Sequence, residues 1–397
     1  MRGEPEVAGL GYDDGLTMEI EDDVSLAPQT TLGLGGPARH LIVARDEETV
    51  VEAVAWAKAS GRGLELTVLG GGSNLVVADA GFEGVVLRVE LRGVRVDEQT
   101  PLADGRVRVA AAAGEPWDGL VDLAVERGLG GIECLAGIPG LVGATPIQNV
   151  GAYGQEVSDT IVEVRVLDRA TGEIVGLSNH ACEFGYRDSV FKRRPAAFVV
   201  LGVTFGLTPA AGGAGGDGRA APPRYRELAA YLREGARRDA ASASDRDPTL
   251  AEVSRAVRAL RRAKSMVLDP ADPNRRSVGS FFTNPVVDTA AVAAVVGRAL
   301  AAGLVTTAAE VPQFPTTRPE RVKLSAGWLI EKAGFTKGFR RGPVGLSSNH
   351  ALALVHHGGG TTAELLTLAR EIRDAVSAIW GITLAPEPTL LGTTLDG

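Results

Sequence analysis

The sequence predicts an α+β protein of two or three domains. Its 397 residues, 45% of them hydrophobic, are enough to bury more than one core. Up to about residue 207, short apolar runs typical of strands mix with single helical patterns, whereas the last hundred residues hold two long helical patterns and few strands. Glycine-rich turns separate these segments, and no internal repeat of solenoid length occurs.

Composition argues against several classes of protein. The 41 Lys and Arg against 49 Asp and Glu give a net charge of −8, so we expect no nucleic-acid partner. Two cysteines, Cys134 and Cys182, are too few for a disulfide scaffold and have no metal-ligand spacing, which favours a reducing compartment, the cytoplasm, and predicts no metal. No run approaches the roughly 20 apolar residues of a membrane span, so we expect no membrane association.

The first elements in order are a lead-in and a unit over residues 26–90. Residues 1–25 show no periodicity, and we expect them to be disordered or, if Met18 is the true start, largely absent. A strand at 40–44 is followed by a helix over 47–61, in which Val50, Val51 and Val54 recur at helical spacing. A strand at 64–69, a glycine turn and a strand at 75–77 follow.

The following segment should also be rich in strands, so that one sheet-rich domain extends to about residue 207. A strand at 106–112 precedes a helix over 116–128, with Pro116 at its first position and Gly128 as its cap. A hairpin over 161–177 and a strand at 198–207 follow, and residues 208–223 are expected to be a flexible loop. A capping box at Thr249 and Glu252 opens a helix that extends to about 266. Its basic face, residues 255–264, is most simply solvated, although it could attract a nucleotide diphosphate.

The last unit, residues 269–392, contains two long helices. The first runs over 286–303, and the second begins at the capping box of Thr361 and Glu364. A strand is expected at 351–355, and another over 381–391 closes the unit. The pair His356 and His357 has no carboxylate-rich partner nearby in the sequence, so it is not a candidate metal site.

Three glycine clusters could approach phosphate groups. LGLGGPA fits G-x-G-x-x-A through Gly33, Gly35 and Ala38, but a strand rather than a helix should follow it, so a Rossmann turn is a weak interpretation. LGGGSNLVV, residues 69–77, follows a strand and is better suited to a diphosphate, although ordinary turns also hold such clusters. The third, residues 131–157, is far longer than the usual two to six residues of a connection, and long structured loops often wrap a ligand.

Seven strings now resemble a known family. GLGGPA, LGGGSNLVV, LAGIPGLVGATPIQNVGAYGQEV, GYRDSVFK, GSFFTNPVV, QFP with VKLSAGWLIEKAG, and PEPTLLG occur in the order found in UDP-N-acetylenolpyruvoylglucosamine reductases, flavoenzymes of peptidoglycan precursor synthesis. The resemblance covers residues 27–392. It implies a two-part FAD-binding domain of the vanillyl-alcohol-oxidase type over 26–90 and 91–268, then an α+β substrate-binding domain over 269–392 whose end returns Glu387 to the active site.

The resemblance also implies an activity. NADPH would reduce FAD, and reduced FAD would reduce the enolpyruvyl ether of a UDP-sugar, UDP-N-acetylglucosamine-enolpyruvate, to UDP-N-acetylmuramate. A cytoplasmic monomer is expected. FAD should be noncovalent, because the segment around GGGSN holds no histidine to which it could be attached.

The resemblance assigns site residues by position. The catalytic positions are Arg187, Ser280 and Glu387. The substrate-binding positions are Tyr186, Tyr225, Lys264, Asn284 and Gln313, although the segment after Lys264 is longer and more basic than a minimal family linker. The FAD-binding positions are Gly33, Gly35, Gly36, Gly70, Gly71, Gly72, Ser73, Asn74, Leu75, Gly137, Ile138, Pro139, Gly140, Gly143, Ala144, Gly151 and Ala152.

Side-chain chemistry agrees with the three catalytic assignments. Hydride addition leaves negative charge on the neighbouring carbon and its carboxylate, which the permanent charge of Arg187 can stabilise. Ser280 can donate the final proton, and we expect Phe281 and Phe282 to exclude water from it. Glu387 should be protonated or share a proton through burial, because an ionised carboxylate would repel the intermediate. Alone, each has an ordinary interpretation: a surface arginine, a strand-end serine and a loop carboxylate.

Two other functions fit part of the pattern. Another flavin dehydrogenase or oxidase of the same fold would use the glycine loops but leave Ser280 and Glu387 without a role. A nucleotide-sugar sensor without catalysis would not need Arg187, Ser280 and Glu387 to be intact.

Overall fold

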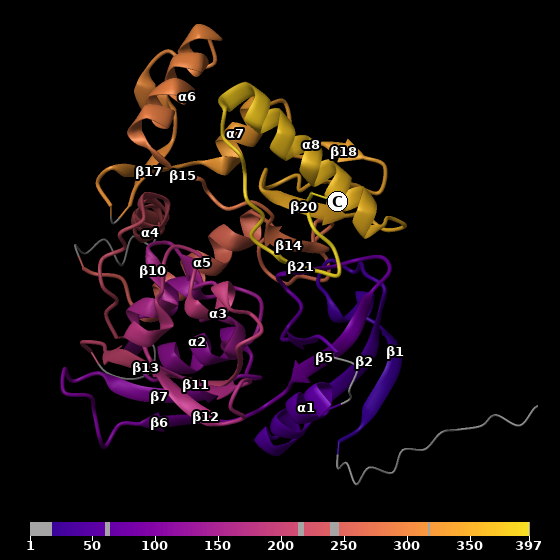
Figure 1. Ribbon diagram of the computed structural model, residues 1–397. Helices are drawn as coiled ribbons and strands as arrows, with labels where there is room; N and C mark the ends of the chain where they lie inside the picture. Colours follow the sequence, from indigo (N-terminus) through magenta and orange to yellow (C-terminus); the bar gives the residue numbers. More distant parts are fainter. Residues whose placement is uncertain (1–17, 60–63, 213–217, 239–245, 317, 397) are drawn as a thin grey trace, which may run out of the picture.

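The computed structural model describes residues 18–59, 64–212, 218–238, 246–316 and 318–396. It is an α+β protein of three packed units (Figure 1). Figure 1 shows the two N-terminal units side by side and the C-terminal unit lying across them, with β21 reaching back to the first unit. No described helix is both long and apolar enough to span a membrane.

The first unit is a four-stranded sheet in the order β1-β2-β5-β3, with α1 (Glu47–Ala59) packed on it. The helix buries Val50 and Val54, as their spacing predicted, together with Ala53, whereas Val51 is only half-buried. β5 pairs in parallel with both β2 and β3, and β1 pairs antiparallel with β2. The four strands of the sheet are β1 (Ile20–Ser25), β2 (Pro37–Ala44), β3 (Leu66–Leu69) and β5 (Phe82–Val89), and β4 (Leu75–Val77) lies outside this sheet.

The expectation that residues up to 25 lack structure is wrong for β1. This is an edge strand whose acidic side chains are exposed, and only Ile20 and Val24 are half-buried. Backbone hydrogen bonds to β2 hold it, and these leave little trace in the sequence. Residues 1–17 lie outside the described residues.

The second unit is an antiparallel sheet in the order β12-β11-β13-β7-β6, with β8 beside β13. Its 12-residue strand β13 pairs with β11 on one side and with β7 on the other. The expected hairpin is present as β11 and β12. The strands are β6 (Val94–Asp97), β7 (Val107–Ala112), β8 (Leu129–Gly130), β9 (Gly151–Ala152), β10 (Gln155–Glu156), β11 (Ile161–Asp168), β12 (Ile174–Ser178) and β13 (Phe198–Pro209), and the helices are α2 (Trp117–Glu126), α3 (Val190–Arg193), α4 (Arg226–Arg238) and α5 (Leu250–Ala263).

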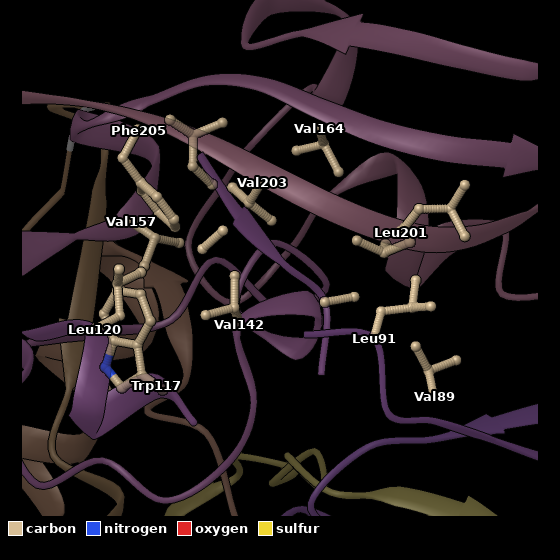
Figure 2. Close-up of a cluster of buried hydrophobic side chains, with 14 of the residues drawn as sticks. Val89, Leu91, Trp117, Leu120, Val142, Val157, Val164, Leu201, Val203 and Phe205 are labelled. Carbon is tan, nitrogen blue, oxygen red and sulfur yellow. The ribbon is translucent and has the colours of Figure 1, made fainter. Parts of the chain in front are cut away.

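The core of this unit fixes the long glycine-rich segment over the sheet (Figure 2). Trp117 is fully buried against Phe205, with 5.8 Å between ring centroids, and its indole N–H donates to the carbonyl of Leu135 at 3.1 Å. The short 3-10 helix Val142–Ala144 is held against the sheet because the amide of Gly143 donates to the carbonyl of Ala113 at 2.8 Å. The segment is therefore an ordered structure rather than a loose loop.

The C-terminal unit has two small antiparallel sheets, β14-β20-β19-β18 and β15-β17-β16, covered by three helices. Its core is built around Phe281, Phe282 and Trp380 and also takes in Leu32 and Val76 of the first unit. The elements are β14 (Ser277–Ser280), β15 (Val286–Asp288), α6 (Thr289–Ala301), β16 (Gln313–Pro315), β17 (Arg321–Leu324), α7 (Ala326–Lys332), β18 (Arg340–Arg341), β19 (Val344–Leu346), β20 (Ala353–His356), α8 (Thr362–Trp380) and β21 (Thr389–Leu391).

Helix ends with a local capping signal are where the sequence predicts them. Both capping boxes form, at Thr249 with Glu252 and at Thr361 with Glu364. Gly128 ends α2 with φ +67°, the left-handed conformation that favours glycine. Pro116, expected at the first helical position, instead lies one residue before α2.

Two expectations about irregular segments need correction. The strand predicted over 381–391 is only β21, and it pairs in parallel with β4 of the first unit rather than within the last unit. Pro386 and Pro388 have no N–H to donate, which keeps the preceding residues out of a regular ladder. The segment 208–223 is not a flexible loop at its described ends. Its first two residues belong to β13, and the amide of Ala220 donates to the carbonyl of Pro248 at 2.9 Å. Residues 213–217 lie outside the described residues.

Candidate active site

A groove lies where the three units meet, and it contains about 2160 Å³ of space free of protein atoms, open solvent included. Its walls come from the Gly70–Leu75 turn, from the long glycine-rich segment and from β14. Arg187, Ser280 and Glu387 all line it, although 200 residues separate the first from the last. The fold therefore brings the three predicted catalytic residues to one cavity.

The Gly71–Ser73 turn is shaped by close approach of backbone to backbone. Gly72 has φ +62°, and a Cβ there would lie 1.9 Å from the carbonyl oxygen of Gln29, so the position requires glycine. Ser73 Oγ donates to the carbonyl of Pro139 at 3.2 Å, which ties this turn to the second glycine-rich wall. Among the described residues, the amides of Gly71, Gly72 and Ser73 donate no hydrogen bond to the protein. Such a row of free amides fits the diphosphate of a dinucleotide such as FAD.

The expected FAD-binding residues divide into those that line the groove and those that do not. Gly33, Gly35 and Gly36 do not line it. Gly35 and Gly36 instead pack against β4 and the residues after it: a Cβ on Gly35 would lie 2.6 Å from Val77 Cβ, and one on Gly36 would lie 2.2 Å from the carbonyl oxygen of Asp79. Gly137 and Ala152 are also outside the lining, whereas the other expected positions line it: Gly70, Gly71, Gly72, Ser73, Asn74, Leu75, Ile138, Pro139, Gly140, Gly143, Ala144 and Gly151.

Arg187 is held in an unusual conformation and is not an isolated surface arginine. Its φ of +53° lies in the left-handed region, which is sparsely populated by residues other than glycine. Its guanidinium donates to Glu387 Oε1 at 2.9 Å and to the carbonyl of Gly151 at 2.7 Å. The adjacent residue Asp188 forms an ion pair with Arg193 and not with Arg187.

Ser280 ends β14 and lies beside the segment that holds Glu387. The amide of Glu387 donates to the carbonyl of Phe281 at 2.8 Å, so the two segments are joined by their backbones. The Ser280 hydroxyl is partly exposed in the groove and makes no hydrogen bond among the described residues. A hydroxyl in this position is available to a ligand.

Phe281 and Phe282 do not form the wall expected beside Ser280. Both side chains are fully buried in the core of the C-terminal unit, with ring centroids 5.0 Å apart, and neither lines the groove. They anchor the end of β14 rather than shielding the hydroxyl, because the chain turns their side chains into the core. The expectation of a direct water-excluding role is therefore wrong.

Burial raises the pKa of Glu387, and the neighbouring Arg187 acts in the opposite direction. The net direction agrees with a carboxyl group that retains or shares a proton. A second carboxyl group, Glu156, also has a pKa raised by burial, and its Oε2 accepts a hydrogen bond from Asn149 at 2.8 Å. Burial therefore raises the pKa of both carboxyl groups near Arg187, and the charge of Arg187 acts against that rise in each.

The expected substrate-binding residues occupy three places. Tyr186 and Asn284 line a second pocket that shares Arg187 and Lys192 with the groove. Asn284 Oδ1 also accepts from the first amide of α7, Ala326, at 2.9 Å. Lys264 and Tyr225 both lie near Tyr153, outside the two pockets, and Gln313 is exposed on β16 and lines neither.

Sequence reasoning missed two cations. Arg261, expected on a solvated helix face, lines the groove and donates to the carbonyls of Met266 at 2.6 Å and Gly137 at 3.2 Å. Burial lowers its pKa to about 10. Lys323 lies with Nζ 4.2 Å from the ring centroid of Tyr186, and burial lowers its pKa. The position of Arg261 on α5 gave no signal, whereas Lys323 lies within VKLSAGWLIEKAG, one of the strings behind the resemblance.

Comparisons with known proteins agree along the chain. Residues 38–178 match a family described as FAD binding domain, and residues 270–391 match UDP-N-acetylenolpyruvoylglucosamine reductase, C-terminal domain. These matches confirm the expected fold class. The solved UDP-N-acetylenolpyruvylglucosamine reductase of Thermus caldophilus has a similar fold, with a TM-score of 0.59 and 24% identity, covering 94% of this chain and 99% of that one.

Curated relatives are much more similar in sequence. UDP-N-acetylenolpyruvoylglucosamine reductase of Saccharopolyspora erythraea is 51% identical, covering 94% of this chain and 95% of the relative. The reductase of the same name in Mycobacterium tuberculosis is 46% identical, covering 95% and 96%. The chain therefore belongs to the UDP-N-acetylenolpyruvoylglucosamine reductase family and is an FAD-dependent oxidoreductase.

Proposed function

We propose that the protein uses NADPH to reduce the enolpyruvyl ether of UDP-N-acetylglucosamine-enolpyruvate to UDP-N-acetylmuramate, a step of peptidoglycan precursor synthesis in the cytoplasm, and that it acts as a monomer. The observation that supports this most is that Arg187, Ser280 and Glu387 line one groove. The same groove contains the Gly71–Ser73 turn, whose amides donate no hydrogen bond among the described residues. FAD, when bound there, supplies the hydride that the substrate accepts. The Gly70–Leu75 turn and the Ile138–Gly140 wall would hold its diphosphate and adjoining parts.

Arg187 would stabilise the charge that develops on the substrate. The guanidinium is fixed by Glu387 and by the carbonyl of Gly151, so it need not reorganise when an enolate forms. Its planar fork matches a carboxylate. The positive φ of Arg187 is consistent with a strained turn that aims this side chain.

Ser280 would donate the proton that completes the reaction. Its hydroxyl has no competing acceptor among the described residues, and it lines the same groove as Arg187. A serine hydroxyl is a weak acid, but a carbanion-like intermediate is a strong base, so geometry decides the transfer. Glu387 would need a proton near the intermediate to avoid the repulsion of an ionised carboxylate, and the rise of its pKa on burial supports this role.

One anaerobic experiment tests the proposal. The yellow protein is reduced with NADPH, the enolpyruvyl nucleotide sugar is added, and reoxidation of the flavin is followed by stopped flow. Rapid reoxidation without oxygen is the expected result. Reduction without reoxidation would show a different flavin enzyme, and release of no FAD on denaturation would contradict the cofactor itself.

A further inference from the structure

Three cations, one of which lines the groove, act on the charge of His350. Burial together with Lys264, Lys337 and Arg261 lowers the pKa of His350 to about 4, so its imidazole is neutral near pH 7. His350 Nδ1 accepts the amide of Leu352 at 3.0 Å, which places the ring proton on Nε2. The four side chains can therefore offer only positive charge or a hydrogen-bond donor to a ligand.

Two carboxylates lie close enough to act on this cluster, which consists of Arg261, Lys264, Lys337 and His350. Asp118 acts on Arg261 but is paired with Arg258, which leaves Glu227 as the ion-pair partner within the cluster. In the described part of the chain, Lys264 pairs with Glu227, Nζ to Oε2, at 2.6 Å. Neither Arg261 nor Lys337 has a carboxylate within ion-pair distance there, and Arg261 is bonded to two carbonyls. An excess of cations beside a groove favours an anion with several oxygens, such as a diphosphate.

Glu227 is placed to hold Lys264 when no such anion is present. It is the second residue of α4, and the next residue, Leu228, is fully buried and anchors the helix. Lys264 Nζ also lies 5.9 Å from the ring centroid of Tyr153. The side chains of Lys264 and Glu227 are still 35% and 39% exposed, so an incoming anion can reach the pair.

We propose that Glu227 competes with the diphosphate of the substrate for Lys264. The inference rests on the proposed function, which supplies a ligand with a diphosphate. A carboxylate and a phosphate that share one ammonium repel each other, so binding must break or loosen the pair. The pair would then weaken the affinity for substrate without taking part in the chemistry.

Calorimetric binding of UDP to the FAD-loaded protein tests this directly, with inorganic pyrophosphate as a second probe. Glu227→Gln should bind both about two- to fivefold more tightly, which matches the modest free energy of a partly exposed ion pair at 1.4 kcal/mol per factor of ten. Glu126→Gln removes an exposed carboxylate of α2 that has no ion pair among the described residues, and it should leave both affinities unchanged. In a Lys264→Met background, Glu227→Gln should bring no gain.

The opposite results would overturn the inference. Weaker binding of UDP by Glu227→Gln would show that Glu227 positions Lys264 for the ligand. An unchanged affinity, or a gain that persists with Lys264→Met, would show that the pair does not compete. Because UDP binding needs no turnover, these outcomes can be read even if the enolpyruvyl nucleotide sugar fails to reoxidise the flavin, so failure of the proposed function is distinguished from failure of the competition.

Discussion

Replacing Ser280 with alanine should separate the two halves of the reaction. The hydroxyl is partly exposed and bonded to no described residue, so its loss leaves no unsatisfied partner, and the free energy of unfolding should change by less than about 0.5 kcal/mol. General acid catalysis contributes roughly 10²–10⁴-fold, or about 3–5 kcal/mol of the activation barrier. The predicted chemical effect is therefore several times larger than the structural one.

The assay measures both half-reactions on the same preparation. Reduction by NADPH should proceed at the wild-type rate in Ser280→Ala, while reoxidation by the enolpyruvyl nucleotide sugar should fall about 10²-fold or more. Ser280→Cys, which keeps a transferable proton, should recover part of the loss. Equal loss in both half-reactions, or no recovery with cysteine, would refute the proton-donor role and leave Ser280 as a structural residue.

Three further predictions concern stability. Gly36→Ala should lower the free energy of unfolding by about 1–3 kcal/mol in denaturant titrations, because the new Cβ would lie 2.2 Å from the carbonyl oxygen of Asp79. The control Gly297→Ala, in α6 with open space around the new Cβ, should raise the free energy of unfolding by about 0.5–1 kcal/mol. Equal effects of the two substitutions would contradict the packing argument. Burial raises the pKa of Glu387, so its unfolded state loses the proton first as pH rises above its ordinary value. The free energy of unfolding of the wild type should therefore fall relative to that of Glu387→Gln as pH rises from the ordinary pKa of a glutamate to the raised pKa of Glu387. A wild type that becomes more stable relative to the variant over this pH range would contradict the prediction. The pKa of His350 is lowered to about 4, so the unfolded state takes up a proton first as pH falls. The free energy of unfolding of the wild type should therefore fall by on the order of 3 kcal/mol relative to that of His350→Gln between about pH 6.5 and pH 4. Thermal-unfolding profiles of the two proteins that stay parallel with pH would contradict this.

Local signals were predicted well because one stretch of chain determines them. The capping boxes at Thr249 and Thr361 and the glycine cap at Gly128 each need only a few neighbouring residues. β1 was missed because an exposed edge strand needs no apolar alternation. The short β21 was misplaced because its partner, β4, lies in another unit.

The site was predicted by motif, but its contacts could not be. Nothing in GYRDS or PEP shows that Arg187 and Glu387 bond to each other, since that depends on how three units pack. A basic helix pattern likewise cannot show which arginine turns towards a groove, and Arg261 was read as solvated for this reason. The two phenylalanines after Ser280 were given the wrong neighbours because alternation along a strand does not say which face meets the core.

The pairing of β21 with β4 also concerns the order in which the protein is synthesised. Leu75 pairs with Thr389, 314 residues later in the chain, and Thr389 N donates to Asn74 O at 3.0 Å beside the glycine turn. At about 5–20 residues per second, a ribosome needs roughly 15–60 s to add that partner. During this interval β4 is an unpaired strand edge on a unit that can already begin to fold, which makes it a natural site for chaperone binding or for mispairing between nascent chains.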